Sequence, residues 1–213
     1  MPNLLGKKII DSIKHVVGNG SHNLHEPYFC GNEVDYLKKT IKTNTVSSIG
    51  NYVKLFESKI KKFTKCKYTI AVTNCTHALH LSLIACGINR NEEVITPALT
   101  FAATANAITY TGAIPHFVDS EIETLGIDPV KLDIYLKKNT FKKNNFFYNK
   151  NTGRKISAII PVHVFGNICK IERLLKIAKK YNLIVIEDAA EALGSFLKKK
   201  TCWNFWKNWL LEF

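Results

Sequence analysis

The sequence lacks the marks of a secreted, metal-binding or membrane-spanning protein. Its cysteines show no C-x-x-C spacing, which argues against a disulfide framework and a zinc site and is typical of a reducing cytoplasm. No apolar run approaches the ~20 residues of a membrane span, and no secretory signal is visible. We therefore expect a cytoplasmic protein without a metal site. The six cysteines are Cys30, Cys66, Cys75, Cys86, Cys169 and Cys202.

Arginine is also scarce. The formal charge is +13, yet Arg90, Arg154 and Arg173 are the only arginines among 30 basic side chains. Specific nucleic-acid recognition relies on arginine, so we interpret the charge as the Lys, Asn and Ile bias of an A/T-rich genome. A basic nucleic-acid-binding protein remains the weaker alternative, and it predicts tight, steeply salt-dependent DNA binding.

The composition is that of a globular protein, with 46% hydrophobic residues in a chain of 213, long enough for one or two domains. Near the N-terminus, Leu5, Ile9, Ile13 and Val16 follow helical spacing among basic residues. This pattern fits a helix that packs on its own domain, and it also fits a helix on a membrane surface.

Strand and helix patterns alternate from residue 68 onward, which predicts an α/β protein with a mostly parallel sheet and helices on both faces. Residues 139–155 are polar and predict a surface loop. There are no internal repeats. Expected helices are 32–43, 52–63, 77–86, 102–110, 128–138 and 171–181; expected strands are 68–73, 93–96, 116–119, 156–162 and 183–187.

The segment Leu183 to Ser195, L-I-V-I-E-D-A-A-E-A-L-G-S, is the most informative part of the chain. Four apolar residues end in paired carboxylates, and the carboxyl end of a parallel strand is where open α/β sheets hold ligands. Asp188 is therefore expected to emerge into a cofactor crevice, where it could pair with a protonated ring nitrogen. The alternative is a carboxylate that caps the next helix.

Two other expected strand ends carry candidate residues. In T-N-C-T-H-A-L-H-L-S-L, a strand-turn-helix with small residues offers free N–H groups to a phosphate, and Thr76 could add its hydroxyl. An ordinary helix cap explains the same pattern. In P-A-L-T-F-A-A-T-A-N-A, Phe101 could stack on a flat ring, although a core phenylalanine is the commoner outcome.

Many segments, in order, resemble the DegT/DnrJ/StrS family of nucleotide-sugar aminotransferases, which use pyridoxal 5′-phosphate (PLP). The resemblance runs from about residue 25 to residue 200 and is closest to the branch that aminates 4-keto-6-deoxy sugars of the bacillosamine and legionaminic type. The segments are L-H-E-P-Y-F-C-G-N-E, T-V-S-S-I-G, A-L-H-L-S-L, V-I-T-P-A-L-T-F-A-A-T-A-N-A, A-I-P-H-F-V-D, P-V-H-V-F-G and V-I-E-D-A-A-E-A-L-G-S.

The resemblance assigns cofactor roles to five residues. It implies that Asp188 pairs with the pyridinium nitrogen, that Phe101 stacks on the ring and that Glu191 faces the ring hydroxyl. Thr76 and its neighbours would bind the phosphate. Cys75 stands where the family usually has glycine, so its side chain could crowd this phosphate loop.

The resemblance also implies a substrate and an assembly. The intact enzyme would transfer an amino group from an amino acid donor to a nucleotide-linked keto-sugar, as a homodimer whose interface includes residues 45–50. Dehydration of the sugar is an alternative chemistry within the family. Candidate substrate-binding residues are His25, Tyr28, Ser47, Ser48 and His163, the last of which could equally be structural.

The family's Schiff-base lysine belongs to a segment resembling S-F-N-x-N-K, and these 213 residues contain no such segment. One codon choice for residues 202–213, read one base later, gives V-G-I-F-G-K-I-G-Y-L-S-F, close to the family pattern. We therefore expect a frameshift near residue 200. The expected organisation is an N-terminal helix (1–24), a partial fold-type I large domain (25–200) and an aberrant tail (201–213).

These expectations describe the N-terminal fragment of an aminotransferase that is inactive as this chain. The C-terminal strands and the small domain would be missing, including two strands that normally lie between the strand at residue 68 and the strand at residue 156. The rival interpretation is a non-catalytic remnant, or a split subunit that needs a second chain.

Overall fold

The computed structural model describes residues 4–22, 28–47, 50–198 and 200–201, which fall into two units, residues 1–50 and 51–213. The first unit contains two helices, α1 (Leu4–Val17) and α2 (Glu33–Lys42), and neither has a buried residue. Both helices were predicted from the sequence. No described helix combines the length and hydropathy that a membrane span requires.

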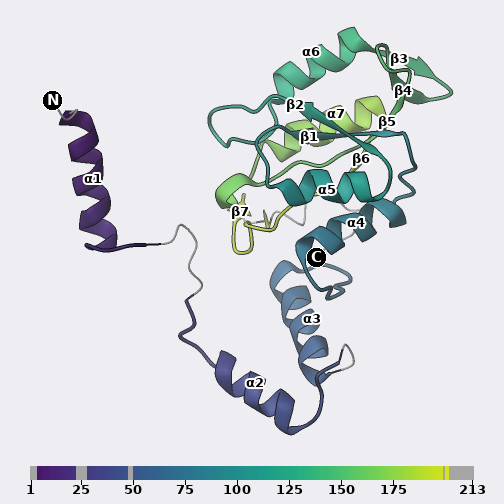
Figure 1. Cartoon of the computed structure of the whole chain (residues 1–213). Helices are drawn as coiled ribbons and strands as arrows, with labels where there is room; N and C mark the ends of the chain where they lie inside the picture. Colours follow the sequence, from purple (N-terminus) through teal and green to yellow (C-terminus); the bar gives the residue numbers. More distant parts are fainter. Residues whose placement is uncertain (1–3, 23–27, 48–49, 199, 202–213) are drawn as a thin grey trace. The chain divides into compact units, whose positions relative to one another are not determined.

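The second unit is an α/β fold with helices on both faces of a mixed sheet, as the sequence predicted (Figure 1). The strand order is β2-β1-β5-β4-β3. Strand β6 also pairs with β5, along the part of β5 that extends past β4. Strands β1, β2, β5 and β6 run parallel to one another. The strands are β1 (Glu93–Pro97), β2 (Ile114–Val118), β3 (Thr140–Lys143), β4 (Phe146–Asn149), β5 (Lys155–Ile159) and β6 (Ile184–Val185), with a separate pair β7 (Phe196–Leu197) and β8 (Lys200–Thr201).

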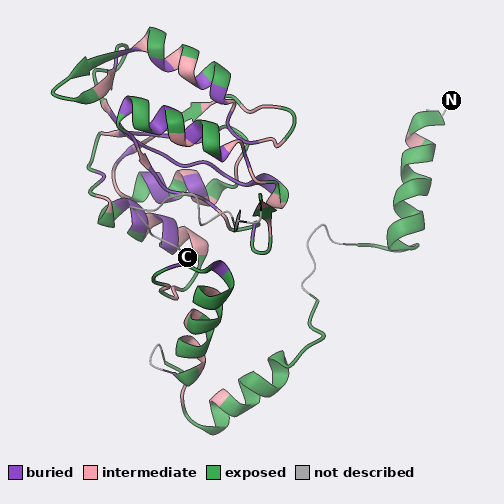
Figure 2. Cartoon of the chain, turned by 180° about the vertical axis from the view of Figure 1, so that it is seen from behind, coloured by how far each residue is buried: buried purple, intermediate pink, exposed green. Residues whose placement is uncertain are grey.

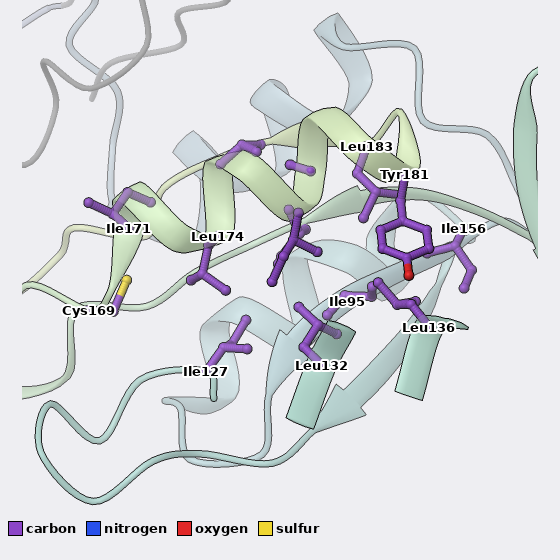
Figure 3. Close-up of a cluster of buried hydrophobic side chains, with 14 residues drawn as sticks. Ile95, Ile127, Leu132, Leu136, Ile156, Cys169, Ile171, Leu174, Tyr181 and Leu183 are labelled. Carbon is purple, nitrogen blue, oxygen red and sulfur yellow. The ribbon is translucent and has the colours of Figure 1, made fainter. Parts of the chain in front are cut away.

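Two hydrophobic clusters bind the helices to the sheet. Side chains alternate across β1, so that Ile95 joins the cluster under α6 and α7 while Val94 joins the cluster under α4 and α5. Figure 3 shows the first cluster, and Figure 2 shows that burial is concentrated in this layered part of the chain. The helices of this unit are α3 (Asn51–Thr64), α4 (Cys75–Ala85), α5 (Ala102–Tyr110), α6 (Pro129–Asn139) and α7 (Ile171–Tyr181), with a short 3₁₀ turn, η1 (Val164–Gly166).

Local sequence signals explain where these helices begin and end. The Asp128 carboxylate accepts hydrogen bonds from the N–H groups of Val130 and Lys131, at 2.8 and 3.1 Å, and Pro129 takes the first helical position of α6. Helix α7 ends at Asn182, which adopts a left-handed conformation with φ of 52°. Both ends agree with the sequence-based expectation to within a residue.

The polar loop expected over residues 139–155 is wrong, because β3 and β4 form an antiparallel hairpin there. Asn144 and Asn145 both have positive φ, 49° and 64°, as a two-residue hairpin turn requires. The rings of Phe141 and Tyr148 stack across the pair with centroids 5.6 Å apart. The many Lys and Asn residues concealed a strand pair stabilised by aromatic contacts.

The strand expected over residues 68–73 is also wrong, because this segment has no strand partner among the described residues. Side chains satisfy its backbone instead. The Ala71 N–H donates to Glu57 Oε1 at 2.9 Å, and the Cys66 thiol donates to the Tyr68 carbonyl at 3.1 Å. Ile70 stays exposed, so the apolar run of this segment contributes little to the core.

Candidate functional site

Three segments meet beyond the carboxyl ends of the parallel strands. Asp188 follows β6, Cys75 begins α4, and Thr104 lies in the first turn of α5. The Thr104 hydroxyl donates to Asp188 Oδ2 at 2.6 Å, and the Cys75 thiol lies 3.9 Å from Asp188 Oδ1. Asp188 is only 6% exposed. The structure therefore brings two of the predicted cofactor residues together, because Cys75 contacts the buried carboxylate of Asp188.

The backbone fixes Asp188 at the edge of the sheet. Its N–H donates to the Pro161 carbonyl at 2.9 Å, and its carbonyl accepts from the His163 N–H at 3.1 Å. These bonds continue the parallel pairing of β5 and β6 as an isolated bridge between Val162 and Asp188. The backbone that carries the carboxylate is thus fixed by pairing with its neighbour in the sheet, as the run of apolar residues before it suggested.

The start of α4 supplies free hydrogen-bond donors. Asn74 caps the helix by accepting from the His77 N–H at 2.9 Å. Within the described part of the chain, the N–H groups of Cys75 and Thr76 have no protein acceptor. Such groups, together with the positive end of the helix, favour an anion such as a phosphate.

Cys75 is held as a neutral thiol. Burial, the charge of Asp188 and the hydrogen bond to that carboxylate together raise its pKa to about 11, with burial as the largest cause. Its sulfur is directed at Asp188 Oδ1. The side chain of Cys75, at a position where the sequence resemblance leads us to expect glycine, therefore contacts the carboxylate.

Phe101 occupies the N-cap position of α5, just beyond the end of β1, and is 81% exposed. It is not a core phenylalanine, which was the alternative that the sequence left open. Its neighbour Thr100 bonds through its hydroxyl to the hydroxyl of Thr104 at 2.7 Å. Phe101, with its exposed ring, is thus next in sequence to Thr100, and the Thr100 hydroxyl bonds to Thr104, which in turn bonds to Asp188.

Glu191 lies in the loop after Asp188 and bonds to the 3₁₀ turn η1. Its Oε2 accepts from the Phe165 N–H at 2.7 Å, and Phe165 has a φ of 53°. A Cβ on Gly166 would lie 3.0 Å from the Glu191 carbonyl, so the two loops approach closely. A role for Glu191 near a ring hydroxyl stays a prediction.

His163 is buried beneath the site. Its Nδ1 accepts from the Cys169 N–H at 3.2 Å, so Nε2 carries the hydrogen and donates to Glu187 Oε2 at 3.0 Å. Burial raises the pKa of Glu187, and the bond from His163 opposes that change. His163 thus bonds to the Glu187 side chain and to the Asp188 carbonyl, which favours its structural interpretation.

The other expected substrate-binding residues belong to the first unit. Tyr28 and Ser47 are exposed there, while His25 and Ser48 lie outside the described residues. The expected tail residues 202–213 also lie outside them. The described residues contain no group of three His, Cys, Asp or Glu side chains that could hold a metal ion.

Thr104 is the site residue that sequence reasoning missed. It is fully buried in a helix that otherwise reads as small and apolar. Its position three residues after Phe101, on the inward side of the first turn, is the signal that could have identified it. A threonine flanked by alanines is otherwise an ordinary feature of a helix.

Comparison with known proteins shows which proteins this chain resembles. The chain is 39% identical over 174 residues to GDP-perosamine synthase of Caulobacter vibrioides, covering 82% of this chain and 43% of that protein. It is 30% identical over 190 residues to the putative pyridoxal phosphate-dependent aminotransferase EpsN of Bacillus subtilis, covering 89% and 46%. The X-ray structure of an aminotransferase from Psychrobacter cryohalolentis superposes with a TM-score of 0.66 at 30% identity, covering 79% and 39%.

The chain spans less than half the length of these relatives. The family profile matches residues 29–205, a range that includes α2 and the residues around Asp188. The chain belongs to the DegT/DnrJ/EryC1/StrS aminotransferase family.

Proposed function

We propose that this chain is the N-terminal, cofactor-binding part of a PLP-dependent nucleotide-sugar aminotransferase. The observation that carries the proposal is the convergence of a buried carboxylate, Asp188, with the free N–H groups of α4. The exposed ring of Phe101 starts the neighbouring helix α5, which packs on α4. Few ligands other than a pyridinium phosphate would use all three features.

The residues fit the cofactor by their chemistry. A carboxylate stabilises a protonated ring nitrogen, the start of α4 suits a phosphate dianion, and an aromatic face suits a flat ring. When bound, PLP supplies an electron sink for the carbanion that forms during amino transfer. The chain provides these groups from three different elements.

Each residue then has a defined task. Asp188 holds a proton on the ring nitrogen, and the N–H groups of Cys75 and Thr76 bind phosphate oxygens. Phe101 covers one face of the ring and excludes water from it. His163 and Glu187 keep the segment under Asp188 in place through their 3.0 Å hydrogen bond. All of these tasks are binding and positioning tasks.

The substrate is a nucleotide-linked 4-keto-6-deoxy sugar, and the amino donor is an amino acid. The likeness to GDP-perosamine synthase supports this substrate class. In the assembled enzyme, a homodimer, Tyr28 and Ser47 would contact the sugar nucleotide, together with His25 and Ser48. Glu191 would face the ring hydroxyl from the loop after Asp188.

Amino transfer by the 213 residues alone is not expected. Among the described lysines, Lys198 follows Asp188 most closely, and its ammonium bonds to Glu172 at 2.7 Å. We therefore expect borohydride treatment with PLP to leave no single lysine carrying a pyridoxyl group, as measured by peptide mass spectrometry. One defined, fully modified lysine together with amino transfer from glutamate would contradict this expectation.

Titration of the full chain with PLP, followed by absorbance, tests cofactor binding. Asp188→Asn keeps the size of the side chain but removes the charge that pairs with the ring nitrogen. Its dissociation constant should rise at least about tenfold, since a charged hydrogen bond contributes ~1.5–3 kcal/mol. Asp133→Asn removes an exposed ion pair between Asp133 of α6 and Lys180 of α7; it is the matched control and should bind normally. Equal binding by Asp188→Asn and the wild type would refute the proposed site.

A further inference from the structure

The hydroxyl groups of Thr100 and Thr104 connect Asp188 to the start of α5. Thr104 is 0% exposed, and its Oγ1 lies 2.6 Å from Asp188 Oδ2 and 2.7 Å from Thr100 Oγ1. The first of these is a short bond to a carboxylate in a water-free setting, where hydrogen bonds are strongest. Neither threonine has a role in the proposed function as stated above.

The donor and acceptor in each of these two hydrogen bonds follow from counting hydrogens. A threonine hydroxyl carries one hydrogen, and an ionised carboxylate can only accept. Thr104 therefore donates to Asp188, so it must accept from Thr100. The two bonds point the same way and polarise one another, which strengthens both.

The two oxygens of Asp188 are held very differently. Oδ2 receives the short bond from Thr104. Oδ1 has only longer contacts, with the Ala190 N–H at 3.3 Å and the Cys75 thiol at 3.9 Å. Because both of its contacts are long and therefore weak, Oδ1 is the oxygen that a stronger donor, such as a protonated ring nitrogen, can engage.

We propose that the Thr100–Thr104 hydroxyl chain positions Asp188, fixing Oδ2 so that Oδ1 is presented to the ring nitrogen of the cofactor. This inference rests on the proposed PLP function. The two hydroxyl groups also connect the carboxylate to the first turn of α5, a helix whose N-cap is Phe101. The ring-stacking residue and the nitrogen partner are thereby connected by the hydroxyl groups of buried Thr104 and half-buried Thr100.

Thr104→Val tests this role because it keeps the side-chain shape and removes the hydrogen. In the full chain, the PLP dissociation constant should rise about tenfold, the size expected for one charge-assisted hydrogen bond. With ¹⁵N-labelled PLP, the ring nitrogen signal should move toward the unprotonated position. Thr104→Ser, which restores the hydroxyl, should return both readings to within about twofold of the wild type.

Two further variants separate positioning from folding. Thr100→Val leaves the Thr104–Asp188 bond and removes the second bond together with a long 3.4 Å bond to the Phe101 carbonyl, so its effect should be smaller, about threefold. Thr140→Val is the matched control. Thr140 is also buried, and its hydroxyl donates to the Leu136 carbonyl of α6 at 2.6 Å, with no bond to Asp188 among the described residues. This variant should lose stability without any change in the ¹⁵N signal.

A readout without PLP distinguishes a failed inference from a failed cofactor proposal. Cys75 contacts Asp188 Oδ1, so its alkylation rate reports how that carboxylate is held. Thr104→Val should change the rate at least about threefold in the cofactor-free chain, and Thr140→Val should not. Unchanged Cys75 alkylation, or an unchanged ¹⁵N signal in a chain that binds PLP, would overturn the positioning role. Absence of PLP binding in the wild type would refute the cofactor proposal. The Cys75 alkylation rates would then decide whether Thr104 positions Asp188.

Discussion

Two buried carboxylates lie at opposite ends of the parallel strands and have different partners. Glu93 begins β1 and is 3% exposed; Asp188 follows β6. Glu93 accepts from His116 Nδ1 at 2.7 Å, Asn149 Nδ2 at 2.9 Å and Thr152 Oγ1 at 2.5 Å. Asp188 has one short bond, from Thr104, and its other oxygen has only longer contacts.

The comparison shows how surroundings divide structural from functional carboxylates. Burial acts to raise the pKa of Glu93, but the bonds from His116, Thr152 and Asn149 outweigh it and lower the pKa to about 2. Glu93 thus joins β1 and β2 to the end of the β3–β4 hairpin, with both oxygens used. Asp188 keeps one oxygen with only long contacts, at the end of the sheet where α/β proteins bind ligands.

Removing the charge of Glu93 should have the largest effect on stability. Glu93→Gln leaves donors unpaired around a buried amide and should lower the free energy of unfolding by about 3 kcal/mol, as breaking a buried charged network does. Urea denaturation measures this. Glu123→Gln is the control, because it removes an ion pair in which Glu123 is 72% exposed, and should change stability by less than about 0.5 kcal/mol. Similar losses in the two variants would remove the distinction.

The same network predicts an acid-dependent loss of stability. Because the pKa of Glu93 falls from 4.5 to about 2 on folding, its contribution is complete above pH 4.5 and disappears as the pH falls toward 2. Other carboxylates add to the acid loss, so the difference between wild type and Glu93→Gln isolates this residue. That difference should shrink steadily across this pH window in thermal melts, and a constant difference would contradict it.

Much of the fold could be predicted because its signals are local. The capping carboxylate of Asp128 with Pro129, and the apolar spacing of α7, need no knowledge of distant residues. The β3–β4 hairpin was missed because its stability comes from aromatic contacts, one across the strands and one between Phe147 and Tyr181 of α7, 4.9 Å apart. The segment 68–73 was misassigned because a strand needs a neighbour, and side chains satisfied its backbone first.

The site was predictable in part for the same reason. Asp188 and Phe101 stand at strand ends, which a pattern of apolar runs locates. The Glu93 network and the Thr104 bond join residues 23 to 84 positions apart in sequence, and no local pattern specifies such pairs. The position of Cys75 could be read from the sequence, but its contact with Asp188 requires the fold.

The smallest expected effect concerns Cys75, which reports directly on Asp188. With its pKa raised to about 11, roughly one thiol in a thousand is ionised at pH 8, compared with about a quarter for an ordinary cysteine. Iodoacetamide should therefore modify Cys75 at least about 100-fold more slowly than exposed Cys30, the internal standard in the same sample. Asp188→Asn removes the charge that helps to raise this pKa, so Cys75 should then react about fivefold faster, whereas Glu93→Gln should leave its rate unchanged in folded protein. Peptide mass spectrometry measures both rates, and an equal response to the two substitutions would mean that Cys75 senses general loosening instead of the Asp188 carboxylate.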